Sequence, residues 1–226
     1  MTTKDGLDGR AVLVFGASGA LGSGVAAAFA ESGALVTGVD RAMPAFGNTT
    51  AGIAYETVNV LDDAALGALF DGRPAPWAVI NTVGGFAAHR PLAELDVEEF
   101  TSQIALNLAT AALITKHALR VMRPIGEGRI VHTASRAAVA HAGSGFAYSV
   151  SKLGVIHLVS MAADEVRGTG ITVNCVVPSI IDTPANRAAM PRADHDAWPK
   201  VANVASSYLY LASPAAHLVN GAALPV

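Results

Sequence analysis

Short runs of nearly continuous apolar, β-branched residues alternate along the chain with longer alanine-rich stretches. The apolar runs predict strands at residues 11–15, 35–39, 78–81, 129–133 and 172–177, with weaker candidates at 53–60 and 222–226. Strands that are apolar on both faces are typical of a parallel sheet covered by helices on both sides. Because parallel crossovers are right-handed, the pattern predicts an α/β fold with a doubly wound parallel sheet of about seven strands.

Two helical stretches, residues 97–122 and 146–166, have apolar or small residues on nearly every face. A helix of this kind is buried all round. One side of each helix can pack on the sheet, and the other side needs a second cover. The alternatives are a partner subunit and further packing within the chain. We expect a partner, and therefore a homodimer or homotetramer, because large exposed apolar patches are unusual on monomers.

The length of 226 residues suits one domain, and no linker, low-complexity stretch or repeat divides residues 1–226. The hydrophobic fraction is 52%, yet no run approaches the roughly 18 uncharged apolar residues of a membrane helix. We therefore expect no membrane association. The first residues lack the pattern of a secretory signal, so a cytoplasmic location is expected.

Charge and metal-ligating residues exclude several other functions. A formal net charge of −3 without a Lys/Arg run argues against a nucleic-acid partner. Cys175 is the only cysteine, so the chain forms no internal disulfide. The seven histidines show no pair at the spacing of metal ligands, and we expect no metal.

A glycine-rich turn, Gly16-Ala17-Ser18-Gly19-Ala20-Leu21-Gly22, joins the first predicted strand to the first helix. Glycines permit a tight turn and a close approach of the backbone to a pyrophosphate, while the helix N-terminus offers unpaired N–H groups. Asp40 closes the second strand, where an acidic side chain can accept hydrogen bonds from an adenosine ribose. Together these features predict a dinucleotide site in a Rossmann-type fold.

Tyr148 and Lys152 are four residues apart at the start of a helical stretch, so their side chains share one face. An ammonium group near a phenol stabilises the phenolate and lowers a pKa that starts at about 10. The pair is therefore suited to proton transfer. Ser135, thirteen residues upstream at the end of an apolar strand, favours a catalytic site over a chance pair on a surface helix.

In these residues and their order, the whole chain resembles the short-chain dehydrogenase/reductase family. Three further segments match motifs of that family: Asn59-Val60, Asn81-Thr82-Val83-Gly84 and Pro178-Ser179-Ile180-Ile181-Asp182-Thr183. The chain departs from the usual motifs where Ala20 and Ser179 stand in place of glycines. None of the departures removes a reacting group.

The resemblance implies a role for each catalytic residue. Tyr148 would be the acid or base, and Ser135 would polarise the substrate oxygen. Lys152 would bind the nicotinamide ribose and lower the pKa of Tyr148, while Asn107 would hold a water in the proton relay. The implied cofactor-binding residues are Gly16, Ser18, Gly19, Ala20, Leu21, Gly22, Asp40, Arg41, Asn59, Val60, Asn81, Val83, Gly84, Tyr148, Lys152, Pro178, Ile181 and Thr183.

The sequence thus predicts an NAD(P)-dependent oxidoreductase that moves a hydride between nicotinamide and a carbonyl or alcohol. NAD(H) is expected over NADP(H), because the extra phosphate of NADP would place like charge beside Asp40. Arg41 could pair with that phosphate, which leaves NADP as an alternative.

Two other functions stay open at the level of sequence. Residues 16–22, 84–85 and 182–198 locally resemble dihydropteridine reductase, which suggests a pterin reductase. Ser135 argues against it, because that enzyme lacks the catalytic serine. The second alternative is a dinucleotide sensor or scaffold without catalysis, since a fold alone does not fix a function.

Overall fold

The computed structural model describes residues 6–44, 50–86, 91–140 and 145–226. Its centre is one seven-stranded sheet in the order β3-β2-β1-β4-β5-β6-β7, in which all neighbours pair in parallel. The strands are β1 (Ala11–Phe15), β2 (Leu35–Asp40), β3 (Ile53–Thr57), β4 (Ala78–Asn81), β5 (Glu127–Thr133), β6 (Gly170–Val177) and β7 (Ala223–Pro225). The predicted doubly wound α/β fold is confirmed.

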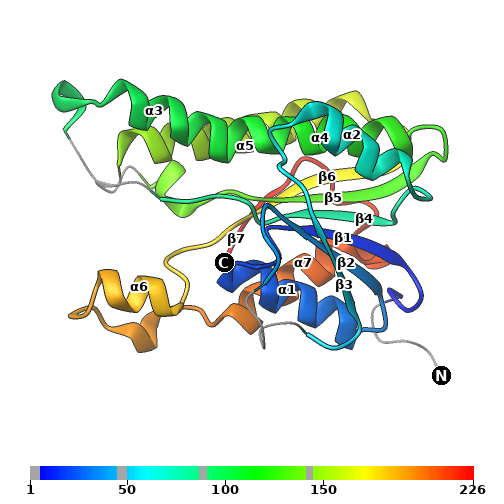
Figure 1. Ribbon diagram of the computed structural model, residues 1–226, viewed down its shortest axis with the longest axis horizontal. Coiled ribbons are helices and arrows are strands. Elements are labelled where there is room, and N and C mark those ends of the chain that lie inside the picture. Colours follow the sequence, from blue (N-terminus) through cyan, green and yellow to red (C-terminus); the bar gives the residue numbers. More distant parts are fainter. Residues whose placement is uncertain (1–5, 45–49, 87–90, 141–144) are drawn as a thin grey trace.

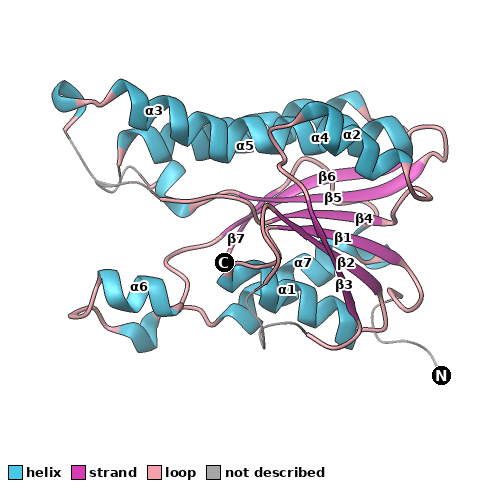
Figure 2. Cartoon of the chain, in the orientation of Figure 1, coloured by secondary structure: helices cyan, strands magenta, loops and turns pink. Residues whose placement is uncertain are grey.

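Helices cover both faces of the sheet (Figures 1 and 2). One layer holds α2 (Asp63–Asp71), α3 (Val97–Gln103), α4 (Thr110–Met122) and α5 (Phe146–Glu165), and the opposite layer holds α1 (Ala20–Glu31) and α7 (Val201–Ala212). The short helix α6 (Pro184–Ala189) lies outside both layers. Alternate residues of β1 serve the two cores: Leu13 and Phe15 pack toward α2, α4 and α5, while Val12 and Val14 pack toward α1 and α7.

The helix expected over residues 97–122 has the predicted extent but not a uniform winding. Between α3 and α4, residues Ile104–Ala109 form a π-helix. Such segments are rare and often occur at functional sites. Asn107 lies in this segment and is buried.

The third strand is shorter than the predicted 53–60, because the chain turns after Thr57. Asn59 initiates the turn: its carbonyl accepts the N–H of Asp62, and its side-chain Oδ1 accepts the N–H of Leu61. Asp62 then caps the N-terminus of α2 through bonds from Ala64 and Ala65.

Helix α5 bears on the expectation that the chain has no membrane helix, which stays a prediction. Among the described residues it is the helix long and apolar enough to cross a membrane, with a mean hydropathy of 1.3 over its apolar window. The core helix of a soluble protein meets the same criterion. Here α5 packs along β6, and Val155, Val159 and Ala163 are buried in the core.

The sequence predicts that residues 97–122 have no polar face, and this prediction is wrong for α4. Its outward positions carry cations that pair with acids of neighbouring helices: Lys116 with Asp63 of α2, Arg120 with Asp71 of α2 and Arg123 with Glu165 of α5. Charged side chains therefore cover part of this helix.

Candidate active site

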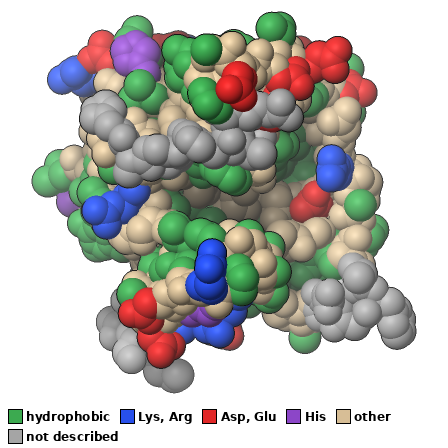
Figure 3. All heavy atoms as spheres, turned by 90° about the vertical axis from the view of Figure 1, so that its left-hand side faces the viewer, with side chains coloured by type: hydrophobic (Ala, Val, Ile, Leu, Met, Phe, Trp, Pro, Cys, Tyr) green, Lys and Arg blue, Asp and Glu red, His purple; other side chains and the backbone are tan. Residues whose placement is uncertain are grey.

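The predicted site residues follow the carboxyl ends of the central strands. Helix α1, after β1, lies on one face of the sheet, and the helices after β4 lie on the other, so the order of strands reverses between β1 and β4. Ligands of open α/β sheets bind in the crevice at such a point. Figure 3 shows this end of the molecule. It is hollowed between the layer that holds α3 and α5 and the segment of residues 182–200 that contains α6, which we call the α6 segment.

The glycine-rich loop after β1 fits a pyrophosphate. A Cβ at Gly22 would lie 2.0 Å from the carbonyl oxygen of Gly16, so only glycine allows this close turn. The first turn of α1 contains no acidic residue, and Gly19 at its N-cap supplies no side-chain hydrogen bond. The N–H groups at the start of α1 therefore remain open to an anion, beside the exposed residues Ser18, Gly19 and Ala20.

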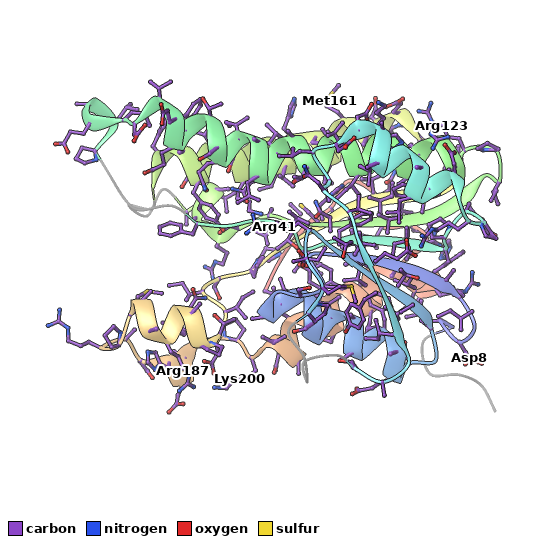
Figure 4. The ribbon with its side chains drawn as sticks, viewed as in Figure 1. Asp8, Arg41, Arg123, Met161, Arg187 and Lys200 are labelled. Atoms are coloured by element: carbon purple, nitrogen blue, oxygen red, sulfur yellow. The ribbon has the colours of Figure 1, made fainter. Side chains whose placement is uncertain are left out.

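Asp40 stands beside this loop at the end of β2. Its Oδ2 accepts the N–H of Ser18 at 2.9 Å and its Oδ1 accepts the N–H of Arg41 at 2.7 Å. The Ser18 hydroxyl donates to the carbonyl of Ala42 at 3.1 Å. The carboxylate is thus held in place next to the predicted phosphate site, while the side chain of Arg41 is exposed (Figure 4).

The end of β4 is bonded to both of its neighbours. Thr82, which replaces an asparagine of the family motif, donates from Oγ1 to the carbonyl of Phe15 in β1 at 2.7 Å. Asn81 is buried, and its Oδ1 accepts the N–H of Val83 at 3.0 Å. A Cβ at Gly84 would lie 2.8 Å from Lys152 Nζ, so the backbone here passes close to the predicted catalytic lysine.

The structure brings Ser135 and Tyr148 close together. Ser135 is the N-cap of the 3₁₀ turn Arg136–Ala138, where its Oγ accepts the N–H of Ala137 at 3.2 Å. Its own proton is therefore free for another acceptor, and the Tyr148 phenol lies close enough for Ser135 to affect its pKa. Burial raises the pKa of Tyr148 above its ordinary value, and the hydrogen bond from Ser135 opposes that rise.

Lys152 is buried one turn along α5, and its Nζ donates to the carbonyl of Thr133 at 2.8 Å. Burial lowers the pKa of Lys152 to about 8. Burial of the phenol is the larger influence on the Tyr148 pKa, and the Lys152 ammonium bonds to a backbone carbonyl, so the expected lowering of the Tyr148 pKa by Lys152 stays a prediction.

Asn107 clamps the segment after β4 through its side-chain amide. Its Oδ1 accepts the N–H of Gly85, and its Nδ2 donates to the carbonyl of Gly85 and to Gln103 Oε1, each at 3.1 Å. The amide is engaged at both ends by protein groups. The predicted part of Asn107 in holding a water stays a prediction.

The remaining predicted residues lie around the crevice. Asn59 is exposed and Val60 is buried beyond the end of β3. Pro178 accepts the N–H of Arg136 at 2.9 Å, which ties the end of β6 to the turn that Ser135 caps. Thr183 caps α6 by accepting the N–H of Asn186 at 3.2 Å, so its hydroxyl proton stays available to another acceptor.

Charged groups hold the base of the α6 segment. Asp182 receives hydrogen bonds from Arg187 of α6 and from Lys200, which precedes α7 (Figure 4). These two cations hold the pKa of Asp182 well below its usual range. The N–H of Asp182 also bonds to the carbonyl of Pro199 at 2.9 Å, so the segment forms a loop closed at its base.

Sequence analysis missed three side chains of the site. The ring of Phe86 meets that of Tyr148 edge to face, with centroids 5.2 Å apart, and is 62% exposed. Gln103 orients Asn107. His132 is fully buried in β5 between polar partners. Only His132 left a signal, as a polar residue in the middle of an apolar strand.

Metal and thiol chemistry find no support in the part of the chain that the structure describes. No group of three His, Cys, Asp or Glu side chains there has the arrangement to hold a metal ion. Cys175 is buried in β6, and burial raises the pKa of its thiol to about 12. A protonated, buried thiol is inert.

Comparison with known proteins agrees with this geometry. A family model described as enoyl-(acyl carrier protein) reductase matches residues 16–226. Cis-4-hydroxycyclohexanecarboxylate dehydrogenase of Sinomonas cyclohexanicum is 35% identical over 74% of this chain and 72% of its own length. D-threitol dehydrogenase of Mycolicibacterium smegmatis is 30% identical over 97% of this chain and 92% of its own.

Solved structures give the same picture. A short-chain type dehydrogenase/reductase from Mycobacterium ulcerans superposes with a TM-score of 0.87 at 27% identity, covering 97% of this chain and 89% of that one. Levodione reductase superposes with a TM-score of 0.91 at 24% identity, covering 97% and 96%.

The sheet order and the open glycine-rich loop at its switch point define a dinucleotide-binding oxidoreductase fold. The chain belongs to the short-chain dehydrogenase/reductase family. It is therefore an oxidoreductase of alcohol or carbonyl groups, and the family implies a nicotinamide dinucleotide cofactor. The local similarity to dihydropteridine reductase stays a prediction, because none of the relatives named here is a pterin reductase.

Proposed function

We propose that this protein transfers a hydride between NAD(H) and a small alcohol or ketone, with Tyr148 as the acid or base. The observation that carries the proposal is the grouping of three side chains: Ser135 lies close enough to the Tyr148 phenol to lower its pKa, and buried Lys152 lies one helical turn further along α5. Gly22, Asp40 and the open N-terminus of α1 would hold the pyrophosphate and the adenosine ribose. When bound, the nicotinamide supplies or accepts the hydride.

The protein's own groups move the proton. For reduction, Ser135 donates a hydrogen bond to the substrate oxygen while the Tyr148 phenol gives that oxygen its proton. The phenolate left behind is stabilised by the charged form of Lys152, which is held one turn away along α5. For oxidation, the phenolate takes the hydroxyl proton. Phe86 meets the Tyr148 ring edge to face and is largely exposed, so it adds an apolar surface next to Tyr148.

Turnover of NADH with a panel of cyclic ketones, open-chain ketones, diketones and a quinonoid pterin tests this function. Tyr148→Phe removes the transferable proton but little surface, so we expect less than a few per cent of the wild-type kcat and a Kd for NADH within about twofold. Tyr210→Phe, on the exposed side of α7, is the matched control and should keep full activity. Substantial activity in Tyr148→Phe would remove Tyr148 from the mechanism, and absence of NADH binding would overturn the function.

The preference for NAD(H) rests on Asp40. At about 4 Å and an effective dielectric constant near 20, repulsion between two unit charges is roughly 4 kcal/mol, and exposure to solvent reduces it severalfold. Even about 1.4 kcal/mol corresponds to tenfold discrimination. Because Ser18 and Arg41 hold the carboxylate through backbone N–H groups, moving it aside would break two hydrogen bonds.

Kinetics with both cofactors test the preference. We expect kcat/KM with NADH to exceed that with NADPH by tenfold or more, and Asp40→Ser to reduce the ratio toward one. Asp62→Ser, which changes a carboxylate at the N-cap of α2, is the control for loss of charge alone. Equal or better kcat/KM with NADPH in the wild type would contradict the proposal.

We also propose that a second copy of the chain covers the outer face of α4 and α5. Leu153 and Met161 of α5 are 48% and 59% exposed, and Met161 points away from the sheet (Figure 4). A groove of about 580 Å³ runs between the two helices beside Met161.

Light scattering should give a dimer or tetramer that Met161→Glu dissociates. Leu218→Glu, at an 85% exposed position elsewhere, should not. A monomeric wild type at micromolar concentration would contradict this.

A further inference from the structure

A chain of buried polar groups connects α4 through β5 to the end of β4, and no step of the proposed reaction uses it. His132 is fully buried in β5. Its Nε2 lies 2.8 Å from Thr115 Oγ1 of α4, and its Nδ1 lies 3.1 Å from Asn81 Nδ2 of β4. Both ring nitrogens therefore have a partner, one from helix α4 and one from strand β4.

The partners determine which ring nitrogen carries the proton. Thr115 Oγ1 donates its own proton to the carbonyl of Ala111 at 2.8 Å, so it accepts a bond from Nε2–H. Asn81 Nδ2 is a donor, so Nδ1 accepts. The opposite tautomer would require Asn81 to turn over, which would set its NH₂ group against the N–H of Val83. Only the Nε2–H tautomer satisfies all these groups.

The orientation of Asn81 has a consequence at the active site. Its Oδ1 holds the N–H of Val83 at 3.0 Å, and Val83 leads directly into Gly84. At Gly84 the backbone lies so close to Lys152 and Asn107 that a Cβ would be 2.8 Å from Nζ and 2.7 Å from Oδ1. A shift of this segment by a few tenths of an ångström therefore changes its contact with both catalytic side chains.

We propose that His132 is a positioning residue of the active site: by accepting the Asn81 amide proton at Nδ1, it fixes Asn81 in the orientation that seats Val83 and Gly84 beside Lys152. The inference rests on the proposed function for the part that this segment plays in cofactor binding. Burial, helped by the nearby charge of Lys152, lowers the pKa of His132 to about 3. The ring therefore stays neutral and keeps a single N–H at any pH used for an assay.

Two amide variants separate positioning from packing. His132→Asn places an amide oxygen near the position of Nδ1 and keeps the acceptor for Asn81. His132→Gln reaches the position of Nε2 and keeps the donor for Thr115, but it leaves the Asn81 amide unpaired. We expect the Kd for NADH, measured by fluorescence, to rise roughly tenfold in His132→Gln, as for one buried hydrogen bond left unmade, and to stay within about threefold in His132→Asn. Equal weakening by both variants, or no effect of either, would overturn the proposal.

A measurement on the wild-type protein needs neither cofactor nor variant. Long-range ¹H–¹⁵N spectra of protein labelled with ¹⁵N-histidine distinguish the two neutral tautomers. We expect the Nε2–H pattern for His132, unchanged between pH 8 and pH 5. An Nδ1–H pattern, or titration of this ring within that range, would overturn the inference. Failure of the wild type to bind NADH would instead count against the proposed function.

Discussion

The two sides of the candidate site are held by different forces. On the sheet side, hydrogen bonds join the ends of neighbouring strands: Thr82 after β4 donates to Phe15 of β1, and Asn81 of β4 donates to buried His132 of β5. On the α6 side, the segment between Asp182 and Lys200 lies outside the helical layers and is held by ion pairs with exposed cations. Buried polar groups are costly to leave unpaired, whereas exposed ion pairs contribute little because water screens them.

This difference matches what each side has to do. The sheet side must present a cofactor and a proton donor at fixed distances, and a misplacement of about 1 Å is costly in catalysis. The α6 side carries residues 182–200, which we expect to shape the pocket for the substrate because the hollow in Figure 3 lies against them. A segment closed at its base by Asp182 can change its outer residues without disturbing the sheet.

The largest expected effect is a loss of folding stability at acidic pH, caused by buried His132 on the sheet side. His132 has its pKa lowered to about 3 by burial, against about 6.5 in the unfolded chain. As pH falls below 6.5, His132 becomes protonated in the unfolded chain but stays neutral in the folded chain. The free energy of unfolding therefore decreases by about 1.4 kcal/mol per pH unit until about pH 3. Between pH 8 and 4.5, where most carboxylates are still charged, the loss is about 2.7 kcal/mol.

Urea unfolding at a series of pH values measures this loss. His132→Asn does not titrate, so its free energy of unfolding should fall less over the same interval, and the difference between the two proteins should follow one proton. Parallel curves for wild type and variant would show that His132 is not the acid-sensitive group.

Ser135→Ala should have the next largest effect. The variant removes the hydroxyl that bonds to the Tyr148 phenol and, in the proposed mechanism, to the substrate oxygen. We expect kcat to fall on the order of 10²-fold, as for loss of one donor to a developing oxyanion. Ser135→Thr, which keeps a hydroxyl, serves as the comparison. A silent Ser135→Ala combined with efficient pterin reduction would favour the pterin reductase alternative.

Two glycine variants test whether the close packing of the sheet side against Lys152 and Asn107 is needed for activity. A Cβ at Gly84 would meet Lys152 Nζ and Asn107 Oδ1, both held by hydrogen bonds, whereas a Cβ at Gly85 would meet only the methyl end of Leu106. Gly84→Ala should therefore lower kcat/KM by about tenfold or more, in line with about 1–3 kcal/mol for overpacking. Gly85→Ala should change it by less than about threefold. Equal effects would mean that the fit against Lys152 is not what limits activity.

Sequence predicted the sheet side better than the α6 side. Strands β1 and β4 have the predicted bounds, because an apolar run that ends at a glycine-rich or polar turn leaves little freedom in where a buried strand stops. Ser135, Tyr148 and Lys152 lie close together, because Ser135 follows β5 and α5 begins beside the same end of the sheet, and their catalytic roles stay predictions. The hydrogen-bond partners of His132 could not be predicted from the sequence, because Thr115 and Asn81 are 17 and 51 residues away along the chain.

The π-helical winding around Asn107 was also beyond reach. The sequence of residues 97–122 has the periodicity of a continuous helix. The hydrogen bond between Asn107 and Gly85 joins residues 22 positions apart in the chain. The α6 segment carries no periodic pattern that predicts its shape. Asp182, Arg187 and Lys200 are ordinary surface residues in the sequence, and only the fold shows that they share one cluster.

The smallest effect is expected on the α6 side, from Asp182→Asn. The change leaves Arg187 and Lys200 without their shared carboxylate, but both cations are about half exposed and are hydrated by solvent. We expect kcat/KM for the ketone to fall two- to threefold through KM, with the Kd for NADH unchanged. Because salt screens exposed charges, 1 M NaCl should lower wild-type kcat/KM toward that of the variant. Lys200→Met keeps the pair between Asp182 and Arg187 and should lie between the two proteins. A tenfold loss in kcat, or weaker NADH binding, would show that the α6 segment is coupled to the sheet side, and the division between the two would fail.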